Sequence, residues 1–224
     1  MVIRVNFKKL IKPIGILLLY IVLSSIESII FYALKTGSML KDNFILIILA
    51  SFTFIVILLI SRKKILEDIQ KFKGRGKQFL ALSLKYWLYG FVYMFVTNLI
   101  INVVLLKGIA PNEAANRELL HTYEYYSILS TCFLAPIMEE IIFRLNFKEA
   151  FNNKNKFIIF TGLLFAAMHL LSSSSWIELI YIIPYTCLGI TFSKIYAETD
   201  NILSSIIIHI IHNTITLFII LGGV

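Results

Sequence analysis

Two adjacent carboxylates and one guanidinium lie within an otherwise apolar stretch, LAPIMEEIIFR at 134–144. Residues four apart share a helical face, so Glu140 and Arg144 are placed to form an ion pair within one helix. Glu139 points about 100° away from that pair. This leaves Glu139 without that partner and available as a general base or acid. Pro136 removes one backbone hydrogen bond and can open the helix beside these groups.

Histidine and asparagine side chains occur in two further apolar stretches. His169 closes an FxxxH pattern, and His209, His212 and Asn213 belong to the sequence HIIHN. His209 and Asn213 are four residues apart, so both can donate hydrogen bonds to a single oxygen from one helical face. His212 lies near the same face, and the spacing alone does not choose between His209 and His212.

The composition indicates that membrane helices carry these groups. Of the 224 residues, 58% are hydrophobic and 15% are charged, and the mean hydropathy is +0.84. A soluble domain has about a quarter of its residues charged, so this class is excluded. Four Pro and ten Gly exclude collagen-like and disordered chains. Cys132 and Cys187 have no ligand spacing, which argues against a disulfide framework or a structural zinc site.

We expect an all-α, polytopic bundle of about seven transmembrane helices, with eight as the alternative. A span needs about 20 mainly apolar residues, and the candidates are approximately 13–34, 43–61, 79–106, 125–147, 157–172, 176–195 and 202–222. No internal repeat is visible, so 1–224 is treated as one membrane domain. Its N-terminal helices (1–124) carry no recognised motif, and 125–222 would be the catalytic core. The polar segment 107–124 is expected to be an outer loop or a short interfacial helix.

The distribution of Lys and Arg orients these helices. With a cytoplasmic N-terminus, 15 basic residues lie on the inner side: Arg4, Lys8, Lys9, Lys12, seven in 62–78, three in 148–156, and Lys194. The outer side has four, which are Lys35, Lys41, Lys107 and Arg117. Cytoplasmic loops carry the excess of Lys and Arg, so the N-terminus is predicted inside and the C-terminus outside. The segment 62–78 is interpreted as a loop that meets anionic lipid. The lipid bilayer is therefore an expected partner, and nucleic acid is not.

Each polar group also has a purely structural interpretation. An ion pair can hold helices together, and a lone His or Asn in a span is more often an interhelical donor than a catalyst. Buried Glu and His also form proton relays in transporters, although transporters usually carry inverted repeats. A rise of about 1.5 Å per residue places Glu139, His169, His209 and Asn213 at similar depth, between the cytoplasmic half and the midplane. This convergence favours a shared site over a non-catalytic binding, scaffold or immunity protein, or a proton-coupled transporter.

Three motifs in this order resemble the signature of a known family: EExxxR at 139–144, FxxxH at 165–169 and HxxxN at 209–213. The family is that of the CAAX proteases and bacteriocin-processing (Abi) proteins, intramembrane endopeptidases that include the Ras-converting enzyme. The resemblance covers about 125–222. It implies that Glu139 activates a water, that His169 holds this water, and that His209 and Asn213 form the oxyanion hole. Glu140 and Arg144 would support these groups.

The resemblance leaves the cofactor and the substrate open. The family has been described both as metalloproteases and as glutamate-type proteases, and one Glu with two His could ligate zinc. No HExxH pair lies on one helix, and His209 facing Asn213 suits an oxyanion better, so we expect no cofactor in preference to zinc. The Ile-, Lys- and Asn-rich composition suggests a low-GC bacterium, and bacteria largely lack prenylated CAAX proteins. We therefore expect a multi-pass plasma-membrane enzyme that cleaves a membrane-associated peptide or protein, in pheromone or bacteriocin processing or immunity.

Overall fold

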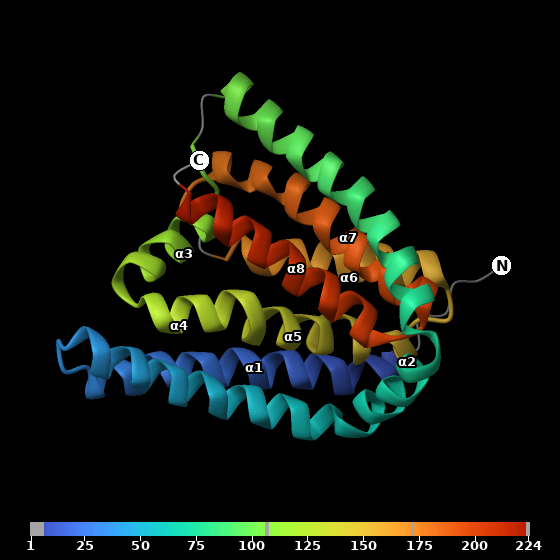
Figure 1. Cartoon of the computed structure of the whole chain (residues 1–224), viewed down its shortest axis with the longest axis horizontal. Helices are drawn as coiled ribbons and strands as arrows, with labels where there is room; N and C mark the ends of the chain where they lie inside the picture. The colour runs from blue at the N-terminus through green and yellow to red at the C-terminus, as the bar shows by residue number, and fades with distance from the viewer. Residues whose placement is uncertain (1–6, 106–107, 172, 223–224) are drawn as a thin grey trace.

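The computed structural model describes residues 7–105, 108–171 and 173–222. Arg4 and Lys107, which were used in the orientation argument, lie outside these ranges. Within them every regular element is a helix and none is a strand, which confirms the predicted all-α class (Figure 1).

The first two helices pack against each other along one side of the bundle. α1 (Phe7–Leu34) is followed by α2 (Met39–Leu105), which is 67 residues long. In Figure 1, α2 runs beside α1, bends sharply, and returns as an arm that contacts α7 and α8. The prediction of a loop at 62–78 was wrong, because this segment lacks proline and is rich in Lys and Arg, which form helices readily.

A second group of helical segments carries the adjacent carboxylates. α3 (Pro111–Thr122) starts with proline at its first turn, as helices tolerate, and confirms a short helix within 107–124. A continuous rod follows, made of α4 (Glu124–Leu129), η1 (Ser130–Leu134), α5 (Ala135–Glu140) and η2 (Ile141–Leu145). Both η1 and η2 are π-helical turns, and such turns interrupt α-helices frequently at functional sites. They flank the short α5, on which the two glutamates lie.

The remaining helices are packed at close range. After η3 (Lys148–Ala150) come α6 (Lys154–His169), η4 (Trp176–Tyr181), α7 (Ile182–Thr199) and α8 (Ile202–Leu221). Gly162 of α6 faces Gly189 of α7, and a Cβ added to Gly162 would lie 2.7 Å from a side-chain carbon of Ile190. Small residues permit this close approach between membrane helices. The pairing of α6 with α7 fixes the position of His169 relative to the rest of the bundle.

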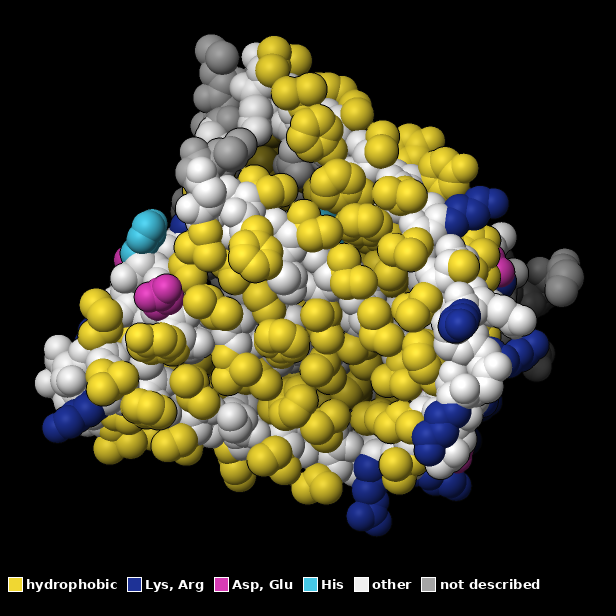
Figure 2. Space-filling view, in the orientation of Figure 1, with side chains coloured by type: hydrophobic (Ala, Val, Ile, Leu, Met, Phe, Trp, Pro, Cys, Tyr) yellow, Lys and Arg dark blue, Asp and Glu magenta, His cyan; other side chains and the backbone are white. Residues whose placement is uncertain are grey.

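Four of the described helices are long and apolar enough to cross a membrane: Lys8–Leu34, Met39–Val104, Trp176–Thr199 and Ile202–Leu221. Large hydrophobic side chains cover the broad face in Figure 2, whereas soluble monomers rarely expose apolar patches of such extent. These features indicate a membrane protein. The predicted spans 43–61 and 79–106 belong to one bent helix, α2, and are therefore not counted separately among these four. The count of seven spans stays a prediction. The orientation in the membrane also stays a prediction.

Candidate active site

Glu140 and Arg144 form a fully buried ion pair next to Glu139. Arg144 Nη1 is 3.1 Å from Glu140 Oε1, and both side chains are 0% exposed, which confirms the pairing predicted from their spacing. The guanidinium also donates to the Gly189 carbonyl at 3.0 Å and to the Ser193 hydroxyl at 3.3 Å. Its central carbon lies 4.6 Å from the centre of the Phe165 ring. A buried charge is tolerated only with such partners. Arg144 therefore joins its own helix to α6 and α7.

His209 of α8 connects this ion pair to Glu139. Its Nδ1 is 2.9 Å from Glu140 Oε1, and its Nε2 is 3.7 Å from Glu139 Oε2. The imidazole is stacked on Phe192, with ring centres 4.2 Å apart. The sequence left Glu139 without a partner on its own helix. The structure supplies that partner from a helix about 70 residues further along the chain.

Hydrogen bonding restricts what His209 can do. The Glu140 carboxylate accepts, so Nδ1 of His209 carries the proton in that contact. In the neutral ring, Nε2 would then turn a lone pair toward the Glu139 carboxylate. Glu139, Glu140 and Arg144 together leave one negative charge, which an imidazolium would neutralise. His209 can therefore donate from Nε2, to Glu139 or to an oxyanion, only as the imidazolium.

Asn213 is held by a carbonyl that Pro136 leaves free. Within η1 the Ala135 N–H bonds to the Ser130 carbonyl, five residues back. In this register the next bond would run from residue 136 to Thr131, but proline has no N–H. The Thr131 carbonyl instead accepts from Asn213 Nδ2 at 2.9 Å. This agrees with the prediction that Pro136 opens the helix beside the site, and it leaves the second Nδ2 hydrogen of Asn213 for another acceptor.

His169 can offer a hydrogen-bond acceptor. Its Nδ1 is 2.8 Å from the Phe165 carbonyl, which can only accept, so Nδ1 carries the hydrogen and Nε2 of the neutral ring is an acceptor. The ring lies against Tyr185 of α7, with centres 4.8 Å apart. Sequence reasoning did not single out Tyr185, because one tyrosine among many aromatic residues in apolar helices has no distinctive spacing.

The structure distinguishes His209 from His212, which the spacing in the sequence could not do. His212 does not share the contacts of His209 with the glutamates; its Nδ1 lies 3.4 Å from Nε1 of Trp87, which donates. The neutral His212 ring therefore carries its hydrogen on Nε2. Phe91 and Phe192 pack edge-on against the same ring. Trp87 was not predicted, because the contact joins α2 to α8 and no local pattern encodes it.

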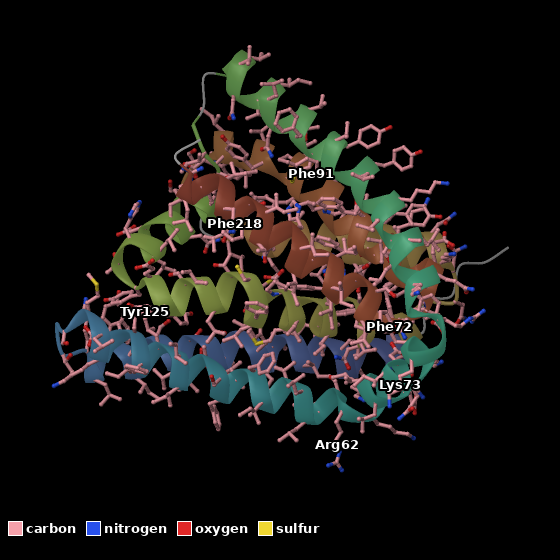
Figure 3. All side chains as sticks on the ribbon, in the orientation of Figure 1. Arg62, Phe72, Lys73, Phe91, Tyr125 and Phe218 are labelled. Carbon is pink, nitrogen blue, oxygen red and sulfur yellow. The ribbon has the colours of Figure 1, made fainter. Side chains whose placement is uncertain are left out.

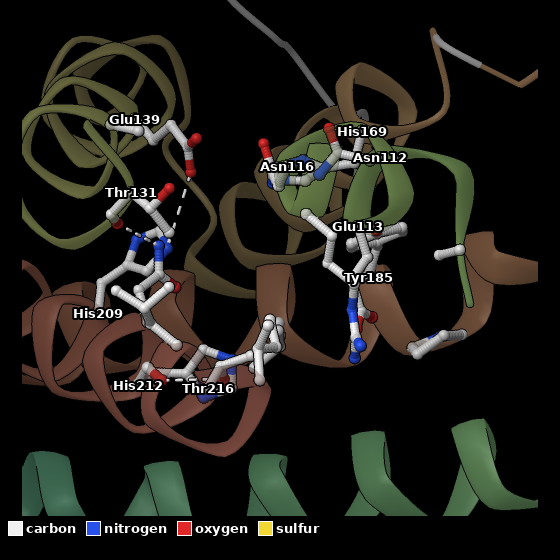
Figure 4. A pocket seen from close by; sticks show the side chains of 18 of the residues that line it. Asn112, Glu113, Asn116, Thr131, Glu139, His169, Tyr185, His209, His212 and Thr216 are labelled. Atoms are coloured by element: carbon white, nitrogen blue, oxygen red, sulfur yellow. Dashed lines mark hydrogen bonds and ion pairs between the residues drawn. The ribbon is translucent and has the colours of Figure 1, made fainter. Parts of the chain in front are cut away.

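One cavity of about 300 Å³ collects the candidate catalytic residues (Figure 4). It is lined by Glu139, His169, His209 and Asn213, together with His212 and Tyr185. The side chains of Glu140 and Arg144 do not line it. Residues of α3 do, including Asn112, Glu113, Asn116 and Arg117. These four were missed because the sequence marked 107–124 only as a polar segment outside the membrane.

The donors do not form a zinc site as they are placed. No group of three or more His, Cys, Asp or Glu side chains in the described ranges could hold a metal ion. Tetrahedral zinc needs at least three protein ligands about 2 Å from the metal. Glu139 and His209 are one such pair of donors, but Nδ1 of His209 already faces Glu140.

Comparison with known proteins shows what the C-terminal part of the chain is similar to. Residues 122–215 match the model of a family described as Type II CAAX prenyl endopeptidase Rce1-like. These residues form an Rce1-like segment. The match confirms the family resemblance, since all three motifs lie within the Rce1-like segment. The family description indicates a CAAX protease-type peptidase.

Two relatives from Lactococcus lactis subsp. lactis (strain IL1403) also match. The chain is 26% identical to UPF0177 protein YxdF over 130 residues, which are 55% of this chain and 70% of that protein. It is 42% identical to UPF0177 protein YajF over 78 residues, 35% of this chain and 36% of that protein. No solved structure matches the chain.

Proposed function

We propose that the chain is an intramembrane endopeptidase of the glutamate type, in which Glu139 activates a water for attack on a peptide bond. The observation that carries the proposal is that Glu139, His169, His209 and Asn213 come from three separate helical segments and line one cavity. A site for hydrolysis needs this convergence of a base with hydrogen-bond donors.

Glu139 is the carboxylate suited to be the base. Its side chain is 18% exposed, whereas Glu140 is fully buried and paired with Arg144. His169 offers the acceptor Nε2 to the same cavity and can orient the water. As the water oxygen bonds to the peptide carbonyl carbon, its proton passes to Glu139. When the C–N bond breaks, Glu139 returns this proton to the leaving amine, so the enzyme is regenerated without a cofactor.

Asn213 and His209 are the proposed donors to the oxyanion. Asn213 Nδ2 is fixed by the Thr131 carbonyl, and imidazolium Nε2 of His209 is fixed through Glu140. Donors that are positioned before the reaction need no reorganisation, and one such donor contributes about 2.7–4 kcal/mol. In this scheme Glu140 and Arg144 are positioning residues. They hold the ring of His209 in place through the contact of Glu140 with its Nδ1.

The proposed substrate is a membrane-associated peptide or protein, and the proposed role is in pheromone or bacteriocin processing or in immunity. The alternative is a non-catalytic binding or immunity protein. The same contacts would then only join helices, because buried ion pairs and interhelical hydrogen bonds also stabilise membrane bundles.

Cleavage of an internally quenched peptide library by detergent-purified protein tests the proposal. We expect Glu139→Gln and His169→Ala to fold but to lose about 10²–10⁴-fold in rate, the usual contribution of acid–base catalysis. Glu149→Gln is the matched control, because Glu149 pairs with Lys64 away from the cavity. Cleavage that survives Glu139→Gln would refute the assignment. Loss of activity with a chelator and recovery with zinc would replace the glutamate-type site by a metal site, and no cleavage of any peptide would favour the binding protein.

A further inference from the structure

Ion pairs gather several connecting segments at one end of the bundle. Lys64 of α2 pairs with Glu149 at 2.8 Å, and Lys148 pairs with Asp200 at 3.3 Å. The Lys64 ammonium lowers the pKa of the Glu149 carboxyl, and nearby lysines of α1 add to this effect. The start of α1 and the segments 62–78, 148–156 and 198–201 therefore share one end, here called the basic end. Figure 2 shows Lys and Arg concentrated there.

The other connecting segments meet at the opposite end. The Lys35 ammonium lies 5.8 Å from the centre of the Tyr123 ring. Tyr181 Oη donates to the Gly108 carbonyl at 2.7 Å. In Figure 1 this end, which includes α3 and is called the α3 end, lies far from the start of α1. The two ends hold the segments that the sequence assigned to the inner and outer sides, and the excess of positive charge marks the basic end as cytoplasmic.

The cavity is closed toward the basic end. The residues beyond Glu139 in this direction are fully buried and include Glu140, Arg144, Phe147 and Ile202, each 0% exposed. The Glu140–Arg144 ion pair and the packed aromatic rings fill this side of the bundle. None of the described residues that line the cavity belongs to the segments of the basic end.

The cavity reaches the surface at the α3 end instead. Asn116 lines the cavity and is exposed, and the side chains of Glu113 and Arg117 are 36% and 32% exposed. Figure 4 shows Asn112, Glu113 and Asn116 around the same space as Glu139. Arg117 donates to Glu113 at 2.8 Å, so these two charges offset each other. The carboxamides of Asn112 and Asn116 each offer donors and an acceptor, as a peptide backbone requires.

We propose that the cavity opens to the extracytoplasmic side past α3, and that its substrate is an extended polypeptide segment presented at that face. The side of access follows from the charge distribution and from the shape of the cavity. Only the cleavage of this polypeptide as a substrate rests on the proposed function. A peptide that is confined to the cytoplasmic face would not reach Glu139.

Labelling of single cysteines in intact cells tests the side of access without using any activity. Cys132 and Cys187 are first replaced by Ala. We expect a membrane-impermeant thiol reagent to label Asn116→Cys in intact cells and to label Lys73→Cys, at the basic end, only after permeabilisation. Any other pattern, whether reversed, both labelled or neither labelled, overturns the proposed orientation.

A second pair of variants tests whether water connects the cavity to that side. Thr216 lines the cavity, whereas its neighbour Ile215 is exposed on the apolar surface of α8. We expect a small impermeant reagent to label Thr216→Cys in intact cells at least about ten times faster than Ile215→Cys, because the reactive thiolate forms in water and not in lipid. Equal rates, or labelling of Thr216→Cys only in inverted vesicles, would overturn the proposal. Neither result depends on peptide cleavage, so a failed protease assay leaves this test intact.

Discussion

Replacing Arg144 by Met removes the cation of the buried charge cluster while keeping much of its side-chain volume. The guanidinium has Glu140 at 3.1 Å and also bonds to Gly189 and Ser193. Its loss leaves Glu140 buried with only His209 in contact with its carboxylate. Removal of one partner of a buried ion pair costs about 3–5 kcal/mol, because the remaining charge stays desolvated.

The expected loss can be measured as a fall in the melting temperature of the detergent-purified protein. For a chain of this length, 1 kcal/mol corresponds to about 2–4 °C, so Arg144→Met should lower the melting temperature by about 6–20 °C. Arg62→Met makes the same chemical change at an exposed position, where the side chain points away from the bundle (Figure 3). It should change the melting temperature by less than about 2 °C, since surface substitutions usually alter stability by under 0.5 kcal/mol.

A double substitution separates charge from packing. Glu140→Gln with Arg144→Met leaves no uncompensated carboxylate from this pair. It should be more stable than the sum of the two single losses implies, by about 1–3 kcal/mol. If the losses add, or if Arg144→Met is no worse than Arg62→Met, the cluster does not depend on charge pairing. The proposed role of Glu140 and Arg144 in holding His209 would then also be refuted.

Three further predictions follow from single contacts. Gly189→Ala places a Cβ on the backbone of α6 and should cost about 1–3 kcal/mol or more, whereas Gly74→Ala has open space and should stabilise by up to about 1 kcal/mol, both read from melting temperatures. Trp87→Phe removes the donor to Nδ1 of His212, so ¹⁵N NMR of the histidines should show a mixed tautomer there, and an unchanged Nε2–H form would contradict the assignment. Asp68→Ala removes the carboxylate that accepts the first N–H of α8 and should cost about 0.5–2 kcal/mol, while unchanged stability would show that the cap is dispensable.

Local spacing was sufficient where both partners lie on one helix. The Glu140–Arg144 pair follows from an i, i+4 separation, and the effect of Pro136 follows from its missing N–H. The all-α class follows from composition, because a chain this apolar must satisfy its backbone groups within its own elements in lipid. The family resemblance follows from three short motifs in order.

Other features depended on how the helices pack. The contact of His209 with both glutamates, the bond from Trp87 to His212 and the bond from Asn213 to Thr131 each join different helices. Helical periodicity fixes which residues share a face, but it does not fix which helix that face meets.

The sequence by itself therefore determined the class of the protein, the local ion pair and the candidate catalytic residues. The tertiary structure decided the partner of Glu139, the separation of His209 from His212, and the contribution of α3 to the cavity. The physical reason is that rotation and register of a packed helix are set by distant contacts. Examples are the close approach at Gly189 and the hydrogen bond that the first N–H of α8 donates to the Asp68 carboxylate. No window of local sequence contains both sides of such a contact.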